Sequence, residues 1–293
     1  MQSLFGKPRQ VGSYLAELGE SPVWDAARQR LLWLDILRSR LLLTEPLSGE
    51  TLITELDGRA SAIALDRSGD VVAAIDHDIV ALRPAGGAEK LQSLATEAPG
   101  RFNDGKPDAA GRFWVGTALG DGRALCALYR IEAGKPPAPI VPGVRMSNGI
   151  GWSPDNRVLY YVDTGFRRLN AFDFDLPSGT LSHRRTMLEL PPGELPDGLT
   201  VDAQGRIWLA VWGGSCVLLL TPAGEIVARL DLPTSRVASC TFGGPNLRTL
   251  FVTTAQEGAT AEELRSDVFA GALFAVETEA QGLLPNRVSL RRQ

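Results

Sequence analysis

Short runs of apolar and β-branched residues, separated by Gly, Asp, Asn and Pro, recur along all 293 residues of the chain. Sustained helical periodicity is confined to the part that follows Ala255. Many short strands with turn residues between them predict an all-β fold: a sandwich, a barrel or a propeller. The apolar runs include 31–34, 71–75, 113–116, 158–162, 207–211 and 250–253.

One motif repeats in register and decides among these folds. The stretch from Asn103 to Trp114 aligns with the stretch from Asp197 to Trp208. Each opens with an acid or amide, has Asp at +5, Gly-Arg at +8 and +9, and Trp at +11. Weaker copies keep the frame, at intervals of 41 to 49 residues that match four-stranded propeller blades. The six copies begin near 20, 61, 103, 148, 197 and 239.

We therefore predict a six-bladed β-propeller with four-stranded blades, formed as a single domain by residues 1–293. Gly or Asn at +8 is expected to form the tight turn between a blade's first two strands, because both tolerate positive φ. Residues before Glu20 are expected to add the outer strand of the last blade. Isolated hairpin turns at 148–149 and 197–198 are the alternative interpretation, which six copies in register disfavour.

The first strand of each propeller blade lines the central channel, so the repeat starts predict a ring of residues near one face. Carboxylates buried close together are costly unless a cation neutralises them. Oxygen atoms of Glu20, Asn148 and Asp197, completed by water, would suit a hard divalent ion in this channel. Asn103 would take a fourth place or bind a ligand through its amide. The six axial residues are Glu20, Ser61, Asn103, Asn148, Asp197 and Ser239.

The same register locates the mouth of the channel. Arg101, two residues before Asn103, is suited to hold a hydroxyl or carbonyl oxygen of a substrate. Asp121, Phe166 and Trp212 fall in loops expected at the rim, where an ordinary loop or core role is an equally good interpretation. The pattern leaves the roles of Phe166 and Trp212 open.

Composition disfavours several classes of function. A net charge of -4 and a pI near 5.4 give no electrostatic basis for binding nucleic acid, and no apolar run has the length of a membrane span. Three cysteines without metal spacing, and the lack of a signal core, predict a cytoplasmic protein with reduced thiols. With only His77 and His183, a three-histidine zinc site is impossible and a Ser-His-Asp triad is poorly supported.

At these motifs the chain resembles the family of gluconolactonase, regucalcin (senescence marker protein) and luciferin-regenerating enzyme, and in particular its bacterial sugar lactonases. The resemblance implies a six-bladed propeller with one divalent metal held by Glu20, Asn148 and Asp197. It also implies substrate contacts from Arg101 and Asn103, with Asp121 a weaker candidate because its loop varies. The matching segments are 19–24, 101–106, 147–149, 195–198, 243–247 and 253–255.

The resemblance implies an enzyme that hydrolyses a small sugar lactone to the aldonic acid. The metal would polarise the lactone carbonyl and lower the pKa of a bound water. Asp197 would accept the water proton and later return one to the departing ring oxygen. We expect a monomer. The motifs leave open which lactone is cleaved, and whether the metal is calcium, zinc, manganese, magnesium or iron.

Three other functions fit the same architecture. A phosphotriesterase-like hydrolase is one, and a hydrolase of acyl lactones is another. A strongly apolar rim would favour the acyl lactones, whereas Arg101 and Asp121 favour a polyhydroxylated substrate. The third is a propeller that binds calcium or protein partners without turnover, because a fold alone does not establish catalysis. Such an interaction module, however, has no need of acids and amides gathered at the axis.

Overall fold

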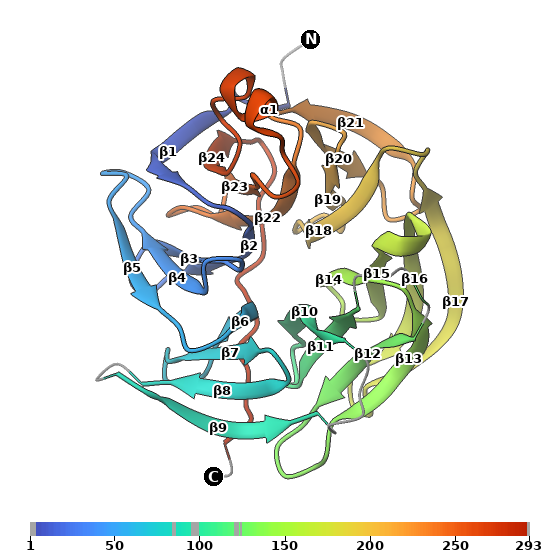
Figure 1. The fold of residues 1–293 in the computed structure, drawn as a ribbon. Coiled ribbons are helices and arrows are strands. Elements are labelled where there is room, and N and C mark those ends of the chain that lie inside the picture. Colours follow the sequence, from blue (N-terminus) through green and yellow to red (C-terminus); the bar gives the residue numbers. More distant parts are fainter. Residues whose placement is uncertain (1–3, 84–85, 95–99, 120–122, 124, 292–293) are drawn as a thin grey trace. The chain divides into compact units, whose positions relative to one another are not determined.

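The computed structural model describes residues 4–83, 86–94, 100–119, 123 and 125–291. In this part of the chain, 24 strands form six four-stranded antiparallel sheets (Figure 1), which confirms the predicted six-bladed β-propeller. Helix is limited among these residues to the short η1 (Thr164–Phe166) and α1 (Ala261–Ser266). No helix in the described ranges has the length and apolar character needed to cross a membrane.

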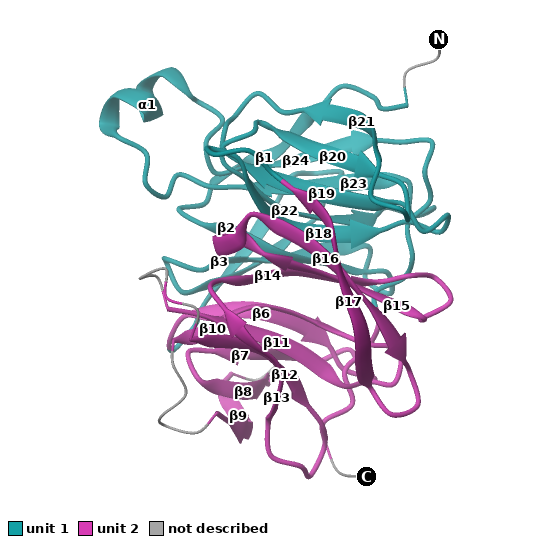
Figure 2. Ribbon diagram, turned by 90° about the vertical axis from the view of Figure 1, so that its right-hand side faces the viewer, with its two compact units in different colours: residues 1–57, 190–285 teal, residues 58–189, 286–293 magenta. Residues whose placement is uncertain are grey.

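The blades fall into two compact units (Figure 2). Unit 1 comprises residues 1–57 and 190–285, and contains blade 1 (β2–β5), blade 5 (β18–β21) and blade 6 (β22–β24 with β1). Its strands are β1 (Arg9–Leu15), β2 (Gly19–Asp25), β3 (Arg30–Asp35), β4 (Arg40–Thr44), β5 (Thr51–Glu55), β18 (Leu195–Val201), β19 (Ile207–Trp212), β20 (Cys216–Leu220), β21 (Ile226–Asp231), β22 (Val237–Gly243), β23 (Thr249–Thr254) and β24 (Ala272–Glu277).

Unit 2 comprises residues 58–189 and 286–293, and contains blade 2 (β6–β9), blade 3 (β10–β13) and blade 4 (β14–β17). The first strands of these blades begin within two residues of the predicted repeat starts. Its strands are β6 (Ala60–Leu65), β7 (Val71–Ile75), β8 (Asp78–Leu82), β9 (Ala88–Ser93), β10 (Arg101–Pro107), β11 (Phe113–Ala118), β12 (Cys126–Ile131), β13 (Ala138–Val144), β14 (Ser147–Trp152), β15 (Val158–Asp163), β16 (Arg168–Asp175) and β17 (Thr180–Glu189).

Blade 6 combines strands from the two ends of unit 1's sequence. β1 pairs antiparallel with β24, with Arg9 opposite Ala275 and Leu15 opposite Ala272. The other three strands of this sheet lie between residues 237 and 277. The prediction that residues before Glu20 supply the outer strand of the last blade is therefore confirmed. This pairing also covers the β24 edge, which would otherwise expose unpaired backbone groups.

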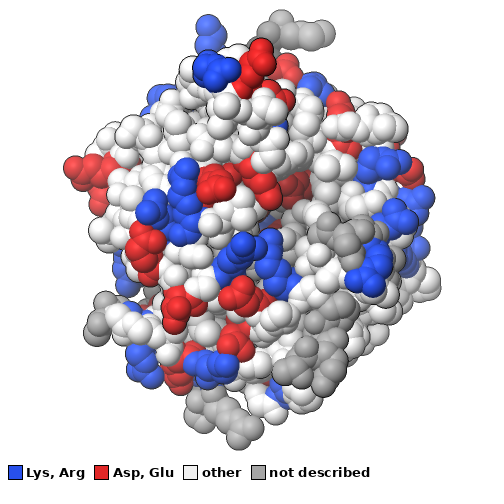
Figure 3. All heavy atoms as spheres, viewed as in Figure 1, with Lys and Arg blue, Asp and Glu red and all other residues white. Residues whose placement is uncertain are grey.

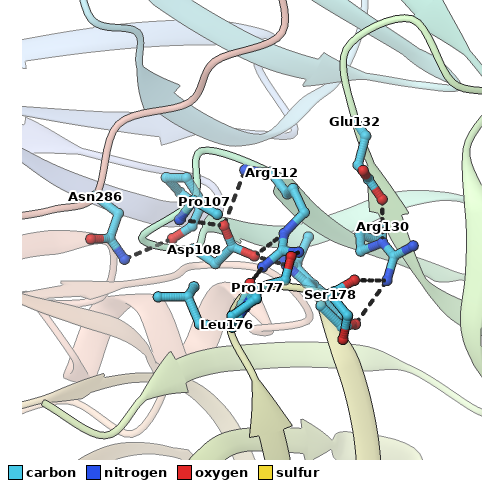
Figure 4. A network of polar contacts seen from close by, with 12 residues as sticks. Pro107, Asp108, Arg112, Arg130, Glu132, Leu176, Pro177, Ser178 and Asn286 are labelled. Carbon is cyan, nitrogen blue, oxygen red and sulfur yellow. Dashed lines mark hydrogen bonds and ion pairs between the residues drawn. The ribbon is translucent and has the colours of Figure 1, made fainter. Parts of the chain in front are cut away.

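The repeated Asp of the motif organises the turn between the first and second strands. In blade 3 the Asp108 carboxylate accepts hydrogen bonds from the backbone N–H groups of Ala110 and Arg112. It also accepts from Arg112 Nε at 2.6 Å (Figure 4) and from Trp114 Nε1 at 2.8 Å. Asp202 of blade 5 accepts from the four equivalent groups. The motif of about a dozen residues therefore contains both the acceptor and the donors of the hydrogen bonds that hold its turn.

The turn residues at +8 adopt the predicted backbone conformation. Gly111 has φ of 86°, Gly205 has φ of 79° and Asn156 has φ of 56°. These values lie in the left-handed region, where glycine and asparagine are tolerated best. The repeated tryptophans are buried, and Trp24 of blade 1 stacks on Phe251 of blade 6 with ring centroids 5.6 Å apart.

The segment after β24 contributes to both units, which the repeat did not predict. In unit 1 the carbonyl of Gln281 accepts a hydrogen bond from the backbone of Ala203. In unit 2, Val288 and Leu290 are buried in the core formed by blades 2 and 3. The Asn286 amide donates to the carbonyl of Pro107 at 3.1 Å (Figure 4).

Candidate metal and substrate site

The first strands carry β-bulges where the repeat places candidate functional residues. In β10 the pair 103–104 lies opposite the single residue Gly116, and in β14 the pair 148–149 lies opposite Val162. In β18 the pair 197–198 lies opposite Ala210. A bulge bends its strand and re-aims the local side chain, and bulges are over-represented beside active sites. The Asn-Gly and Asp-Gly pairs therefore lie inside strands, and their interpretation as hairpin turns is wrong.

In β2 of blade 1 the bulge directly follows Glu20. Glu20 still pairs with Leu34, and the next two residues lie opposite Trp33. The first of these, Ser21, has φ of 49° and donates its backbone N–H to Glu20 Oε2 at 2.8 Å. The bulge thus holds the Glu20 carboxylate by a local backbone hydrogen bond while only 6% of the residue's surface is exposed.

Unit 1 contains both carboxylates of the predicted metal-ligand set. Its first strands pack side by side, because β22 contacts both β2 and β18. Glu20 of β2, Asp197 of β18 and Ser239 of β22 are all buried. Close packing here requires the glycine of the motif, since a Cβ on Gly198 would overlap the side chain of Ser239. The unit therefore places two acids in a tightly packed environment with little access to water.

The donor chemistry of these residues fits a hard divalent cation. Buried carboxylates lose their hydration, and a cation that neutralises them offsets this cost. Carboxylate and amide oxygens are the ligands that such cations prefer. Among the described residues, no group of three or more His, Cys, Asp and Glu side chains is arranged to hold a metal ion. The predicted set of two carboxylates and one amide is a different combination, in which Asn148 belongs to unit 2.

In unit 2 the predicted residues Asn103 and Asn148 form a directed chain of hydrogen bonds. Asn103 Nδ2 donates to the carbonyl of Ser147 at 2.8 Å and to Asn148 Oδ1 at 3.1 Å. Asn148 Nδ2 donates to the hydroxyl of Thr164 at 2.9 Å. Asn148 is buried, whereas Asn103 is half-buried. The two amides therefore act together rather than as separate turn residues.

The direction of this chain follows from the Ser147 carbonyl. A backbone carbonyl can only accept, so the Asn103 group that faces it must be the NH₂. That NH₂ then meets the oxygen of Asn148, and the Asn148 NH₂ points to Thr164. An amide oxygen has two lone pairs, so Asn148 Oδ1 can accept from Asn103 and still coordinate a cation. Asn103, whose NH₂ makes both bonds, offers its Oδ1 as an acceptor.

The turn between β15 and β16, which contains the hydrogen-bond partner of Asn148, is itself held by backbone hydrogen bonds. The Asp163 carboxylate accepts from the backbone N–H groups of Arg145 at 3.4 Å and Met146 at 3.2 Å. Thr164 N–H donates in turn to the Met146 carbonyl at 3.0 Å. Burial raises the pKa of Asp163, although the backbone N–H groups of Met146 and Arg145 oppose this shift. These bonds tie the turn to the start of β14.

The remaining predicted residues take different positions. Arg101 is half-exposed, and its Nη1 donates to the carbonyl of Phe102 at 2.7 Å. Phe166 lies under the Arg145 guanidinium, whose carbon is 4.4 Å from the ring centroid. Trp212, in unit 1, is half-buried at the end of β19. Asp121 lies outside the described residues.

Sequence reasoning missed Thr164 and the Ser147 carbonyl as parts of this arrangement. Thr164 is 16 residues from Asn148, and Ser147 is 44 residues from Asn103. No local motif signals either contact, because both depend on how strands and neighbouring blades pack. Asp163, which ends β15, and Thr164, which begins η1, can be linked to Asn148 only after the sheet register is known.

Fold and site together define a class: a six-bladed β-propeller whose first strands carry acids and amides at bulges. The chain belongs to the SMP-30/gluconolactonase/LRE-like family, whose model matches residues 18–256. Regucalcin from Pongo abelii is 36% identical over 275 residues, 89% of this chain and 90% of that protein. The pentonolactonase XacC from Haloferax volcanii is 36% identical over 272 residues, 90% of this chain and 92% of that protein.

A solved structure agrees with this assignment. The calcium-binding protein regucalcin from Agrobacterium tumefaciens matches with a TM-score of 0.92 and 26% sequence identity. The match covers 97% of this chain and 98% of that one. The family resemblance and the propeller fold predicted from the sequence are thus both confirmed, and the family is one that includes sugar lactone hydrolases.

Proposed function

We propose that this protein is a divalent-metal-dependent lactonase that hydrolyses a sugar lactone to its aldonic acid. The observation that carries the proposal is the burial of Glu20 and Asp197 in unit 1, Glu20 directly before a bulge of its first strand and Asp197 within one. Asn148 adds an oriented amide oxygen at the equivalent bulge in unit 2. The pentonolactonase relative, 36% identical, supports a sugar lactone as the substrate.

Glu20, Asn148 and Asp197 would hold the metal. We assign the three to one ion because they occupy equivalent positions of the sequence repeat. When bound, the metal would polarise the lactone carbonyl and lower the pKa of a water. Asp197 would accept the proton of the attacking water and return one to the departing ring oxygen.

Arg101 and Asn103 would bind the sugar. The guanidinium of Arg101 would donate to a hydroxyl or carbonyl oxygen. Asn103 would accept from a hydroxyl through Oδ1, because its NH₂ already bonds Ser147 and Asn148. We retain Asp121 as a third substrate contact. Basic and acidic side chains are interspersed on the face drawn in Figure 3.

We also propose that the protein is located in the cytoplasm. All three cysteines, at 126, 216 and 240, are buried and form no disulfide, which is consistent with a reducing cytoplasm. We also propose that the protein acts as a monomer on a small molecule. A calcium-binding propeller without turnover is the second candidate, because the Agrobacterium tumefaciens relative is described as a calcium-binding protein.

The test measures lactone hydrolysis on a panel of aldonolactones, with the fall in pH as the readout. Chelated protein is compared with protein given back a single divalent metal, above the spontaneous rate. Asp197→Asn is expected to lose both turnover and metal-dependent stabilisation. Asp25→Asn is the matched control: Asp25 is also buried, 1% exposed against 7% for Asp197, and lies at the far end of the strand that carries Glu20.

The outcomes separate the candidates. Metal-dependent turnover that Asp197→Asn loses and Asp25→Asn keeps supports the lactonase. Tight calcium binding by wild-type protein without turnover of any lactone favours the non-catalytic propeller. If no metal accelerates any lactone, phosphotriesters and acyl lactones are the next substrates to assay.

A further inference from the structure

We propose that Thr164 is a positioning residue that holds the Asn148 amide in the orientation required for metal binding. This inference rests on the proposed function, because it assumes that Asn148 Oδ1 is a metal ligand. Thr164 is buried at the start of η1, in the turn that follows β15. It contacts the site through Asn148, and acts by fixing that side chain.

The geometry gives Thr164 a specific task. Its hydroxyl accepts a hydrogen bond from Asn148 Nδ2 at 2.9 Å. The opposite end of the same amide accepts from Asn103 at 3.1 Å. The amide plane of Asn148 is therefore held at both ends, which fixes the direction of Oδ1. Partners that orient a metal ligand in this way matter nearly as much as the ligand itself.

The backbone of Thr164 is held independently of its hydroxyl. Its N–H donates to the Met146 carbonyl at 3.0 Å, and its carbonyl accepts from Arg167 N–H at 2.9 Å. Valine has nearly the same shape as threonine and keeps both backbone bonds. Thr164→Val therefore removes the acceptor of Asn148 while it retains the turn.

Without that acceptor, the Asn148 NH₂ is a buried donor that must seek another partner. Rotation of the amide toward such a partner moves Oδ1 away from its ligand position. We expect Thr164→Val to weaken metal binding about 10–100-fold, the usual cost of losing a partner that orients a ligand. Thr164→Ser retains the hydroxyl and is expected to bind metal within a few-fold of wild type.

The experiment measures the affinity of the full-length protein for calcium chloride and for manganese chloride by titration calorimetry. Thr44→Val is the matched control. Thr44 is also buried, and its hydroxyl accepts from the indole of Trp33 at 2.9 Å in blade 1. This control is expected to lose stability and to keep the wild-type metal affinity.

A second measurement separates positioning from general damage. Lactone turnover is followed as a function of metal concentration for wild type, Thr164→Val and Thr164→Ser. Thr164→Val is expected to need about 10–100-fold more metal for half-maximal activity, with kcat restored toward the wild-type value at saturation. A merely structural defect would lower kcat at every metal concentration, and would not be rescued by serine.

Two failures are distinguishable. If wild-type protein binds neither metal, the proposed function fails and takes this inference with it. If wild-type protein binds metal and Asn148→Ala weakens that binding, but Thr164→Val binds as tightly as wild type, only the role of Thr164 is overturned. Equal weakening in Thr164→Val and Thr44→Val would also overturn it, because the loss would then follow from buried threonine bonds in general.

Discussion

The amide nitrogen of Asn103 donates a hydrogen bond to the amide oxygen of Asn148 at 3.1 Å, across 45 positions of sequence. The two residues occupy the same repeat position in blades 3 and 4, and each lies in a bulge of its first strand. This bond depends on the Ser147 carbonyl, which selects the NH₂ of Asn103 as the group that faces it. The orientation of the Asn103 amide therefore determines the orientation of the Asn148 amide.

Replacement of Asn103 by aspartate tests this dependence. The carboxylate has nearly the same shape but no donor, and it would face two acceptor oxygens, those of Ser147 and Asn148. We expect Asn103→Asp to lower the free energy of unfolding by about 1–3 kcal/mol, measured by urea unfolding of metal-free protein. Asn246→Asp, at an exposed position, controls for the added charge and should change stability by less than about 0.5 kcal/mol. Equal effects of the two substitutions would contradict the argument.

Replacement of the repeated Asp by Ala is expected to lower stability by different amounts in the two strongest copies of the repeat. Asp108 pairs with Arg112, whose side chain is 9% exposed, whereas Asp202 pairs with Arg206, whose side chain is 28% exposed. Removal of the acid leaves the more buried guanidinium without its partner. We expect Asp108→Ala to cost about 3–5 kcal/mol and Asp202→Ala to cost less. Urea unfolding followed by tryptophan fluorescence measures both, and the reverse order would refute this explanation.

The buried thiol of Cys216 predicts a loss of stability at alkaline pH. Burial raises the pKa of Cys216 to about 11, from an ordinary value of about 8.5. Between these values the unfolded chain has lost this proton while the folded chain keeps it, so stability falls as pH rises through this window. Urea midpoints between pH 8 and pH 11 should fall, with a shallower slope in Cys216→Ala. An unchanged slope in that variant would show that other groups cause the fall.

The same shift predicts slow chemical modification. Only the thiolate is alkylated, and a thiol with a raised pKa holds little of it near neutral pH. Folded protein at pH 8 should therefore react with iodoacetamide at Cys216 much more slowly than urea-unfolded protein, as followed by mass spectrometry. Rapid labelling of the folded protein at this residue would contradict its burial.

The segment after β24 is expected to stabilise unit 2 through its apolar residues. Leu290 is 6% exposed in the core formed by blades 2 and 3, whereas Leu284 is 62% exposed. Leu290→Ala should cost about 2–5 kcal/mol, because it removes a packed side chain. Leu284→Ala, the matched control, should stay within about 0.5 kcal/mol. Thermal or urea unfolding distinguishes them, and a harmless Leu290→Ala would mean that this segment packs loosely.

The sequence alone determined the number of blades and the position of each first strand. It could do so because the motif from Asn103 to Trp114 contains its own turn: Asp108 binds groups two to six residues ahead, and Gly111 takes the positive φ. Such contacts are local, so they recur wherever the motif recurs. The same register marked Glu20 and Asp197 as candidate ligands, and both are buried.

Tertiary structure decided the conformation and the contacts of those motif residues. The repeat disfavours a hairpin turn at Asn148-Gly149, but only pairing with β15 shows that the pair forms a bulge. The partners of Asn148 lie 16 and 45 positions away, at distances that strand pairing and the packing of neighbouring blades determine. The burial of Leu290 likewise depends on strand residues that lie from 159 to 228 positions earlier in the chain. Local pattern specifies elements and turns, whereas contacts between distant residues exist only after those elements have packed.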